Sequence, residues 1–179
     1  MNDFVTCLAQ SHAASDWSGW ETVYRAAFPA FSAMIDHRAD GEHQRAGIDR
    51  SIILTNSKQI LIDEKVRGRN RLTGAVYDDI LLEVWSDERA KSPGWVVKAI
   101  RADYIAYLIA PLQRCYLLPV IQLQAAWQRH GKEWTRTYGT KRSQNRSWVT
   151  ASVPVPVEKL FPAIGGCLRI ETPPYDVTP

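Results

Sequence analysis

The stretch GIDRSIILTNSKQILIDEKV, residues 47–66, decides the fold. It contains two runs of β-branched and aliphatic residues, at residues 48–54 and 59–66, and such residues favour strands. Between the two runs, residues 55–58 (TNSK) are typical of a turn. The pattern therefore predicts two antiparallel strands joined as a hairpin.

Both predicted strands carry charged residues where apolar side chains would pack best. Asp49 opens the first strand, and Asp63 and Lys65 lie two positions apart on the second, so these two side chains share a face. A buried Asp or Lys is costly unless it is paired or bound to a metal. Two carboxylates can hold a hard cation such as Mg²⁺, and the backbone carbonyl of Glu64 could add another oxygen. The charge of Lys65 would then stabilise the transition state of attack on a phosphate.

The length of the hairpin loop decides whether these side chains meet. A four-residue loop would place Asp49 opposite Glu64, on the other face from Asp63 and Lys65. A three- or five-residue loop, or one β-bulge, brings all three side chains to one face. We predict the shifted register, or a bulge near Asp49.

The predicted hairpin resembles the core of the PD-(D/E)xK nucleases, which have the restriction-endonuclease-like fold. The resemblance rests on GID at residues 47–49 and IDEK at residues 62–65. The resemblance covers residues 41–85 well, and no proline precedes the first acid as it does in many members. It implies a helix before the hairpin, a third strand after it, and Mg²⁺- or Mn²⁺-dependent cleavage of DNA phosphodiesters. The implied catalytic residues are Asp49, Asp63 and Lys65, and the implied metal ligands are Asp49, Asp63 and the backbone carbonyl of Glu64.

Three further residues are candidates for the same site. Many members of the family add a carboxylate or a glutamine from the segment before the first acid, and Glu42 or Gln44 would supply it here. Glu83, on a predicted strand at residues 79–85, would be an extra metal ligand or a partner for Lys65, with a structural ion pair as the alternative. For the motif itself, the alternative is a solvated strand end.

The net charge of +3 does not by itself indicate a nucleic-acid partner, so the positions of the charges matter. Residues 129–146 hold six Lys or Arg against one Glu, a net +5 that leaves −2 for the rest of the chain. Aromatic residues lie among these cations, as in surfaces that bind phosphates and stack on bases, and a second basic run follows the motif. The alternative for both is a solvated charged loop. The residues expected to contact DNA are Arg67, Arg69, Arg71, Arg136, Lys141 and Arg142.

The remaining elements follow from periodicity and from proline and glycine signals. A helix is predicted from Asp16 to about Met34, split at Pro29, so that residues 1–40 form a helical N-terminal segment. The other predictions are strands at 104–109 and 115–119, a helix at 119–128, a basic mobile loop at 129–147, an edge strand at 148–157 and a tail at 173–179. The order predicts one α+β domain over residues 1–179, with a restriction-endonuclease-like core whose mixed, mostly antiparallel sheet is flanked by helices.

Several function classes lack support in the sequence. Three scattered cysteines provide neither a disulfide framework nor a CxxC zinc site, and there is no Gly-rich nucleotide-binding loop. Residues 1–10 lack a signal-peptide pattern. The most apolar stretch, residues 104–127, is interrupted by Pro111, Arg114 and Pro119 and is therefore not expected to span a membrane. We expect a cytoplasmic protein with no membrane contact. The expected partner is DNA, and a homodimer is compatible with cutting both strands. The alternatives are an inactive nucleic-acid-binding or assembly protein of the same fold, and a Trp-rich protein-interaction module.

Overall fold

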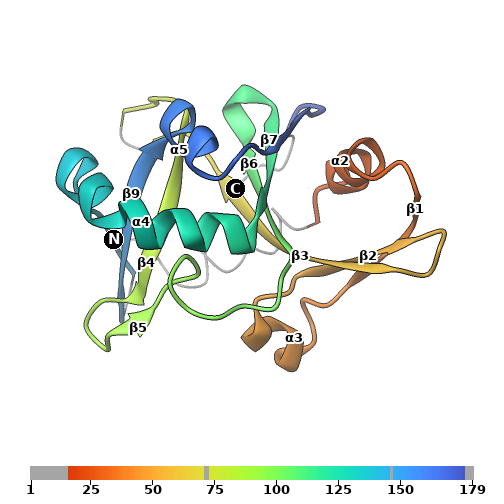
Figure 1. Ribbon diagram of the computed structural model, residues 1–179, viewed down its shortest axis with the longest axis horizontal. Coiled ribbons are helices and arrows are strands. Elements are labelled where there is room, and N and C mark those ends of the chain that lie inside the picture. Colours follow the sequence, from red (N-terminus) through yellow and green to blue (C-terminus); the bar gives the residue numbers. More distant parts are fainter. Residues whose placement is uncertain (1–15, 71–72, 146, 176–179) are drawn as a thin grey trace.

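The computed structural model describes residues 16–70, 73–145 and 147–175, which form two β-sheets and their covering helices (Figure 1). The order of strands in the larger sheet, sheet A, is β1 (Phe31–Asp36), β2 (Arg50–Leu54), β3 (Gln59–Arg67), β6 (Tyr104–Ile109), β7 (Arg114–Pro119) and β10 (Leu168–Glu171). The order in sheet B is β5 (Ser92–Pro93), β4 (Asp79–Asp87), β9 (Val149–Pro156) and β8 (Lys141–Gln144). Every neighbouring pair is antiparallel except β3 and β6, so the predicted α+β class with a mostly antiparallel sheet is confirmed.

The helices cover sheet A on both faces. They are α2 (Gly19–Ala27), α3 (Gly41–Ala46), α4 (Val120–Tyr138) and α5 (Val157–Ala163), with a short 3₁₀ turn at Ala110–Leu112. Helix α2 packs on one face, whereas α4, α5 and sheet B pack on the other (Figure 1). Sheet A is therefore the middle layer. None of the described helices is long and apolar enough to cross a membrane.

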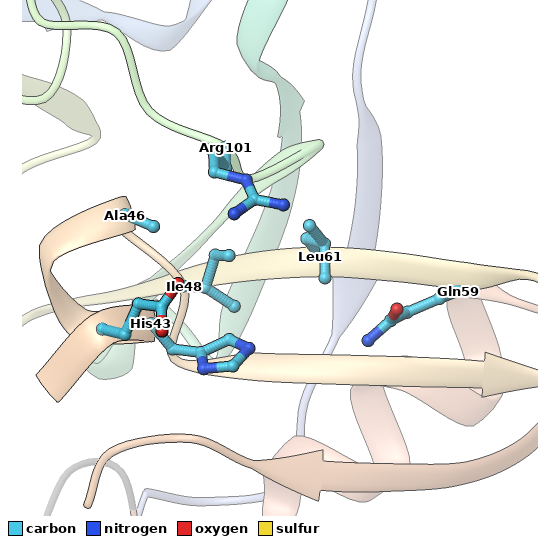
Figure 2. Close-up of a pocket in the computed structure, with 7 residues that line it drawn as sticks. His43, Ala46, Ile48, Gln59, Leu61 and Arg101 are labelled. Carbon is cyan, nitrogen blue, oxygen red and sulfur yellow. The ribbon is translucent and has the colours of Figure 1, made fainter. Parts of the chain in front are cut away.

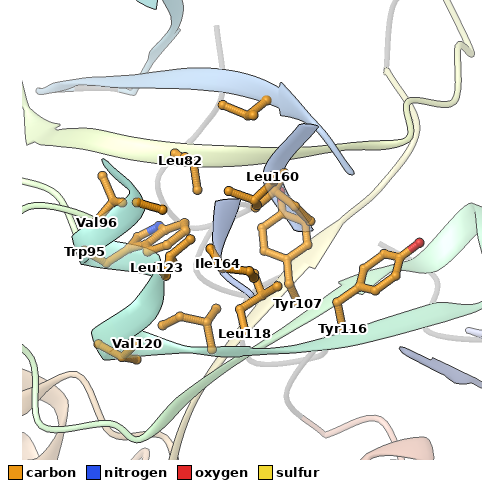
Figure 3. Packing of buried hydrophobic residues seen from close by; sticks show 14 of the residues in the cluster. Leu82, Trp95, Val96, Tyr107, Tyr116, Leu118, Val120, Leu123, Leu160 and Ile164 are labelled. Atoms are coloured by element: carbon orange, nitrogen blue, oxygen red, sulfur yellow. The ribbon is translucent and has the colours of Figure 1, made fainter. Parts of the chain in front are cut away.

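Two hydrophobic clusters hold these layers together. On the α2 side, Trp20 and Tyr24 are fully buried against Ile62 and its neighbours in sheet A. On the other side, Figure 3 shows Tyr107 and Leu118 of sheet A facing side chains from sheet B, α4 and α5. Each large apolar side chain buried in this way contributes about 1.5–3 kcal/mol. Burial on both faces explains why the sequence of β6 and β7 is almost entirely apolar.

The N-terminal segment differs from its prediction. Helix α2 ends at Ala27, and the residues expected to continue it form strand β1, which pairs with β2. Pro29 is the physical reason, because it cannot continue the helix and biases Phe28 toward the extended conformation observed there. The helical assignment of residues 1–40 is therefore wrong for β1, and residues 1–15 lie outside the described part of the chain.

The predicted mobile loop at residues 129–147 is also wrong. Helix α4 continues to Tyr138, and residues 141–144 form strand β8. Gly131 and Trp134 are buried on the same helix, so the apolar spacing that begins at Leu123 continues under the charged residues. The described cations of this segment lie on the outer face of α4 and on the exposed strand β8, and Arg146 lies outside the described residues.

Two other predicted strands form but have different neighbours. Residues 79–87 form β4 in sheet B, and the strand beside β3 in sheet A is β6. Strand β9 lies inside sheet B, yet its prolines Pro154 and Pro156 lie beyond the last residue that β8 pairs with. A proline has no N–H to donate, so this half of β9 has the edge position that its sequence requires.

Candidate functional site

The β2–β3 hairpin has the shifted register that the charged residues require. Arg50 lies opposite Ile62 and Ile53 opposite Gln59, which leaves the five residues 54–58 as the connection. This register confirms the prediction that Asp49 shares a face with Asp63 and Lys65, because side chains alternate along each strand.

Asp49 is fixed by hydrogen bonds at the point where β2 begins. Its backbone N–H donates to the carbonyl of Ile62 at 2.8 Å. Its carboxylate accepts the backbone N–H of Glu64 at 2.8 Å and the side-chain amide of Gln44 at 2.9 Å. Of the two candidates before the first acid, Gln44 therefore contacts Asp49, whereas Glu42 lines a neighbouring pocket.

The backbone of Glu64 faces the gap in front of β2. The Ile62 carbonyl points toward β2, and by strand alternation the N–H and C=O of Glu64 point the same way, beyond the first residue of β2. The Glu64 carbonyl accepts a hydrogen bond from Lys65 Nζ at 3.3 Å, and Lys65 Nζ also donates to Asp63 Oδ1. The Lys65 ammonium thus lies against two oxygen atoms of the predicted metal-ligand set.

The two carboxyl groups differ in their affinity for a proton. Asp63 is 4% exposed, and its burial, with the nearby negative charge of Asp49, raises its pKa to about 7 despite the opposing effect of Lys65. Burial also acts on Asp49, but Lys65 and the hydrogen bonds to its carboxylate bring its pKa below the ordinary value. The pair therefore holds one firm negative charge on Asp49 and a second on Asp63 that forms only near neutral pH.

Lys65 remains charged in this environment. Burial opposes its charge, but Asp63 and Asp49 attract it, and its pKa lies above the ordinary value. Glu83 on β4 contributes to the same shift, which puts this residue within electrostatic range of Lys65. Among the predicted roles of Glu83, the structure supports a partner of Lys65.

Glu83 lies next to an irregularity in sheet B. The pairing of β4 with β9 shifts by one residue between Glu83 and Trp85, and such bulges re-aim side chains next to functional sites. The backbone N–H of Trp95 donates to the Glu83 carboxylate, whose pKa is nevertheless raised by burial. The sequence pattern of β4 shows no sign of this bulge.

We expect Gly94→Ala to displace Glu83 and destabilise the protein. A Cβ atom at this position would lie 2.2 Å from the Glu83 backbone oxygen, an overlap that requires the backbone to shift and costs about 1–3 kcal/mol. Chemical denaturation should detect the loss. Gly68→Ala is the matched control, because a Cβ atom there has no neighbour within 4 Å, and an equal effect of both substitutions would contradict the expected contact.

A buried polar network lies on the opposite face of β3. The side chain of Glu64 is 2% exposed and accepts hydrogen bonds from Tyr24 Oη at 2.7 Å and Arg50 Nε at 2.6 Å. Burial raises the pKa of Glu64 to about 7, although Arg50 and Tyr24 favour the ionised form. The sequence pattern assigns a role only to the backbone carbonyl of Glu64. Alternation with Ile62 was the available signal that its side chain enters the core.

The basic residues beside the motif have different surroundings. Arg67 forms an ion pair of 2.6 Å with Asp79, stacks on Tyr77 and has a side chain that is only 11% exposed, so it holds β3 to β4. We therefore leave Arg67 out of the proposed DNA contacts. Arg69 is exposed, and Arg71 lies outside the described residues.

The second basic cluster is not assembled at the hairpin. Arg136 lies near the C-terminal end of α4, which runs from β7 toward the side of the molecule away from α3 (Figure 1). Lys141 and Arg142 are exposed on β8, and Arg142 forms two hydrogen bonds with Glu88, at 2.7 and 2.8 Å. These residues would contact nucleic acid only if it extended beyond the hairpin.

His37, Asp40 and His43 form another group of metal-ligand type in the described chain, with potential ligand atoms within 4.8 Å of one another. The two rings are stacked, with centroids 3.9 Å apart and planes at 3°. The lone pairs of the ring nitrogens lie in the ring planes. Because the two planes are nearly parallel, these lone pairs do not converge on one ion. His37 Nε2 contacts Ser51 Oγ at 2.7 Å and His43 Nδ1 contacts Asp40 at 2.8 Å, which makes this group a hydrogen-bonded stack.

Comparison of the chain with known proteins does not supply a function for the site. No family model, no curated protein and no solved structure matches the chain. The geometry around Asp49, Asp63 and Lys65 is therefore the basis for a functional proposal.

Proposed function

We propose that this protein is a metal-dependent nuclease that hydrolyses DNA phosphodiester bonds, with Asp49, Asp63 and Lys65 as its catalytic residues. One observation carries the proposal: two carboxyl groups, the Glu64 carbonyl and the Lys65 ammonium gather at the start of β2 on one face of sheet A. The resemblance of the hairpin to the PD-(D/E)xK nucleases requires the same residues on one face.

The donor set fits Mg²⁺ or Mn²⁺. Asp49, Asp63 and the Glu64 carbonyl offer only oxygen atoms, the ligands that these hard cations prefer. The contacts of the Lys65 ammonium with Asp63 and Glu64 indicate that a positive charge is favourable at this position. When bound, the metal ion would supply Lewis-acid activation of the attacking water and of the phosphate.

The protein side chains have separate tasks in this proposal. Gln44 and the N–H of Glu64 orient the Asp49 carboxylate toward the cation. Lys65 stabilises the negative charge that develops on the phosphate oxygens, an interaction stronger in the transition state than in the ground state. Glu83 is a positioning residue whose negative charge adds to the effect of Asp63 and Asp49 in keeping Lys65 ionised.

Cleavage of supercoiled plasmid and of single-stranded DNA, with Mg²⁺ or with EDTA, tests the proposal. We expect Mg²⁺-dependent cleavage that falls by roughly 10²–10³-fold in Asp49→Asn and in Lys65→Ala. Lys58→Ala in the exposed hairpin turn is the matched control and should cleave like the unaltered protein.

Three other results would contradict the nuclease proposal. Cleavage that survives both site substitutions would exclude the proposed residues. No cleavage of any DNA, with binding that weakens as salt increases, would indicate an inactive nucleic-acid-binding protein. No cleavage and no DNA affinity would favour a protein-interaction module.

A further inference from the structure

A small pocket lies beside the proposed catalytic residues, between α3 and the hairpin (Figure 2). Ile48 and Leu61 form its apolar floor, His43 lines it from α3, and Arg101 and Gln59 approach from two other sides (Figure 2). Its volume is about 90 Å³, several times what one ordered water requires. The pocket is thus large enough for a flat ring but not for a folded peptide.

The position of the pocket follows from the strand geometry. Leu61 precedes Asp63 by two residues on β3, so both side chains lie on the same face and about 7 Å apart along the strand. This step is similar to the spacing between neighbouring phosphates of one nucleic-acid strand. A strand whose scissile phosphate reaches Asp63 would place its next nucleotide over Leu61.

The polar groups around the pocket suit a nucleotide. Arg101 is exposed, and none of the described residues forms a hydrogen bond or an ion pair with its guanidinium, which leaves its donors for a phosphate. Its backbone N–H donates to the Ala46 carbonyl at 2.9 Å, which ties this segment to α3. His43 Nδ1 contacts Asp40 and the Gln59 amide donates to Ser51 Oγ at 2.6 Å, and the remaining polar atoms of these two side chains, with the carboxylate of Glu42, offer donors and acceptors to a base edge.

We propose that this pocket binds one unpaired nucleotide next to the scissile phosphate, so that the substrate is single-stranded or locally unpaired DNA. This inference rests on the proposed nuclease function. Helix α3 and Arg101 enclose the apolar floor from two sides (Figure 2), and a base that is stacked and paired inside a duplex could not reach it. The base would lie on Ile48 and Leu61, with its phosphate on Arg101.

Binding measurements in EDTA test the pocket without cleavage. The probes are a short labelled single strand and a duplex of the same sequence, with the full chain, Arg101→Ala and Arg101→Glu. We expect the single-strand affinity to fall about 10-fold in Arg101→Ala and further in Arg101→Glu, with little change for the duplex. Arg25→Ala is the control for loss of one exposed cation, because Arg25 lies on α2, at the other face of sheet A.

Side-chain NMR signals of His43 and Gln59 give a second readout. They should shift with thymidine monophosphate and not with inorganic phosphate alone. Equal NMR shifts with both ligands would overturn the nucleotide assignment in favour of an anion site. In the binding measurements, an equal loss of single-strand and duplex affinity in the Arg101 variants, or no loss, would overturn the proposal that the pocket binds an unpaired nucleotide. Absence of cleavage with Arg101-dependent single-strand binding retained would instead reject the nuclease and keep the binding site.

Discussion

Asp63→Asn is expected to abolish Mg²⁺-dependent cleavage and, at about pH 8, to raise the free energy of unfolding. The two effects have one cause. The buried carboxylate that would bind the metal lowers the stability of the folded protein when no metal is bound. Burial raises the pKa of Asp63 to about 7, well above the value of an unfolded aspartate. The asparagine has nearly the same shape and cannot ionise.

The sign of the pH dependence follows from the proton count. Between the unfolded pKa of about 4 and the folded pKa of about 7, the folded protein binds the Asp63 proton more strongly than the unfolded chain does. The contribution of this group to stability is therefore complete at low pH and is lost as pH rises through that interval. Its full size is at most about 4 kcal/mol, so Asp63→Asn should differ little from the unaltered protein at about pH 4 and most above pH 7.

Urea unfolding across this pH range, with and without Mg²⁺, measures both consequences. Mg²⁺ should stabilise the unaltered protein above pH 7, because a ligand that binds only the folded state shifts the equilibrium, and it should not stabilise Asp63→Asn. Lys58→Ala again provides the control. A variant that is less stable than the unaltered protein above pH 7, or that still responds to Mg²⁺, would contradict the expected role of Asp63.

The part of the site that could be predicted is local in sequence. Two β-branched runs predict the hairpin, and the requirement that Asp49, Asp63 and Lys65 share a face selects its register, which the five-residue connection provides. The choice between Glu42 and Gln44 needed the structure, because the two residues lie on one short helix and only their side-chain directions separate them.

The parts that sequence patterns missed depend on contacts between distant segments. Alternation with Ile62 indicates that the Glu64 carboxyl group is buried, but Tyr24 meets it across 40 positions of the chain, so no local pattern identifies Tyr24 as its partner. The C-terminal half of α4 was missed for another reason, since its charged outer face dilutes the apolar spacing that Trp134 continues. Glu83 lies on β4 in sheet B and Lys65 on β3 in sheet A, so their approach depends on how the two sheets pack, which no local pattern predicts.

The network behind the site predicts a large loss of stability for Arg50→Met. The side chains of Arg50 and Glu64 are 7% and 2% exposed, and Arg50 donates to the Glu64 carboxylate at 2.6 Å. Removal of one partner of a buried ion pair costs about 3–5 kcal/mol, because the remaining charge stays buried without compensation. The cost should be smaller well below the Glu64 pKa of about 7, where the carboxyl group is neutral in the folded protein, and should grow as pH rises.

Unfolding free energies of Arg50→Met at about pH 5 and about pH 8 test this dependence, with the double variant Arg50→Met/Glu64→Gln as the control. Glutamine removes the stranded charge, so the double variant should regain much of the stability that the single variant loses at the higher pH. The Glu64 side chain lies on the face of β3 opposite Asp63. The folded double variant should therefore still cleave DNA if the proposed site is correct. An equal loss at both pH values, without recovery in the double variant, would mean that Arg50 acts through packing and not through its charge.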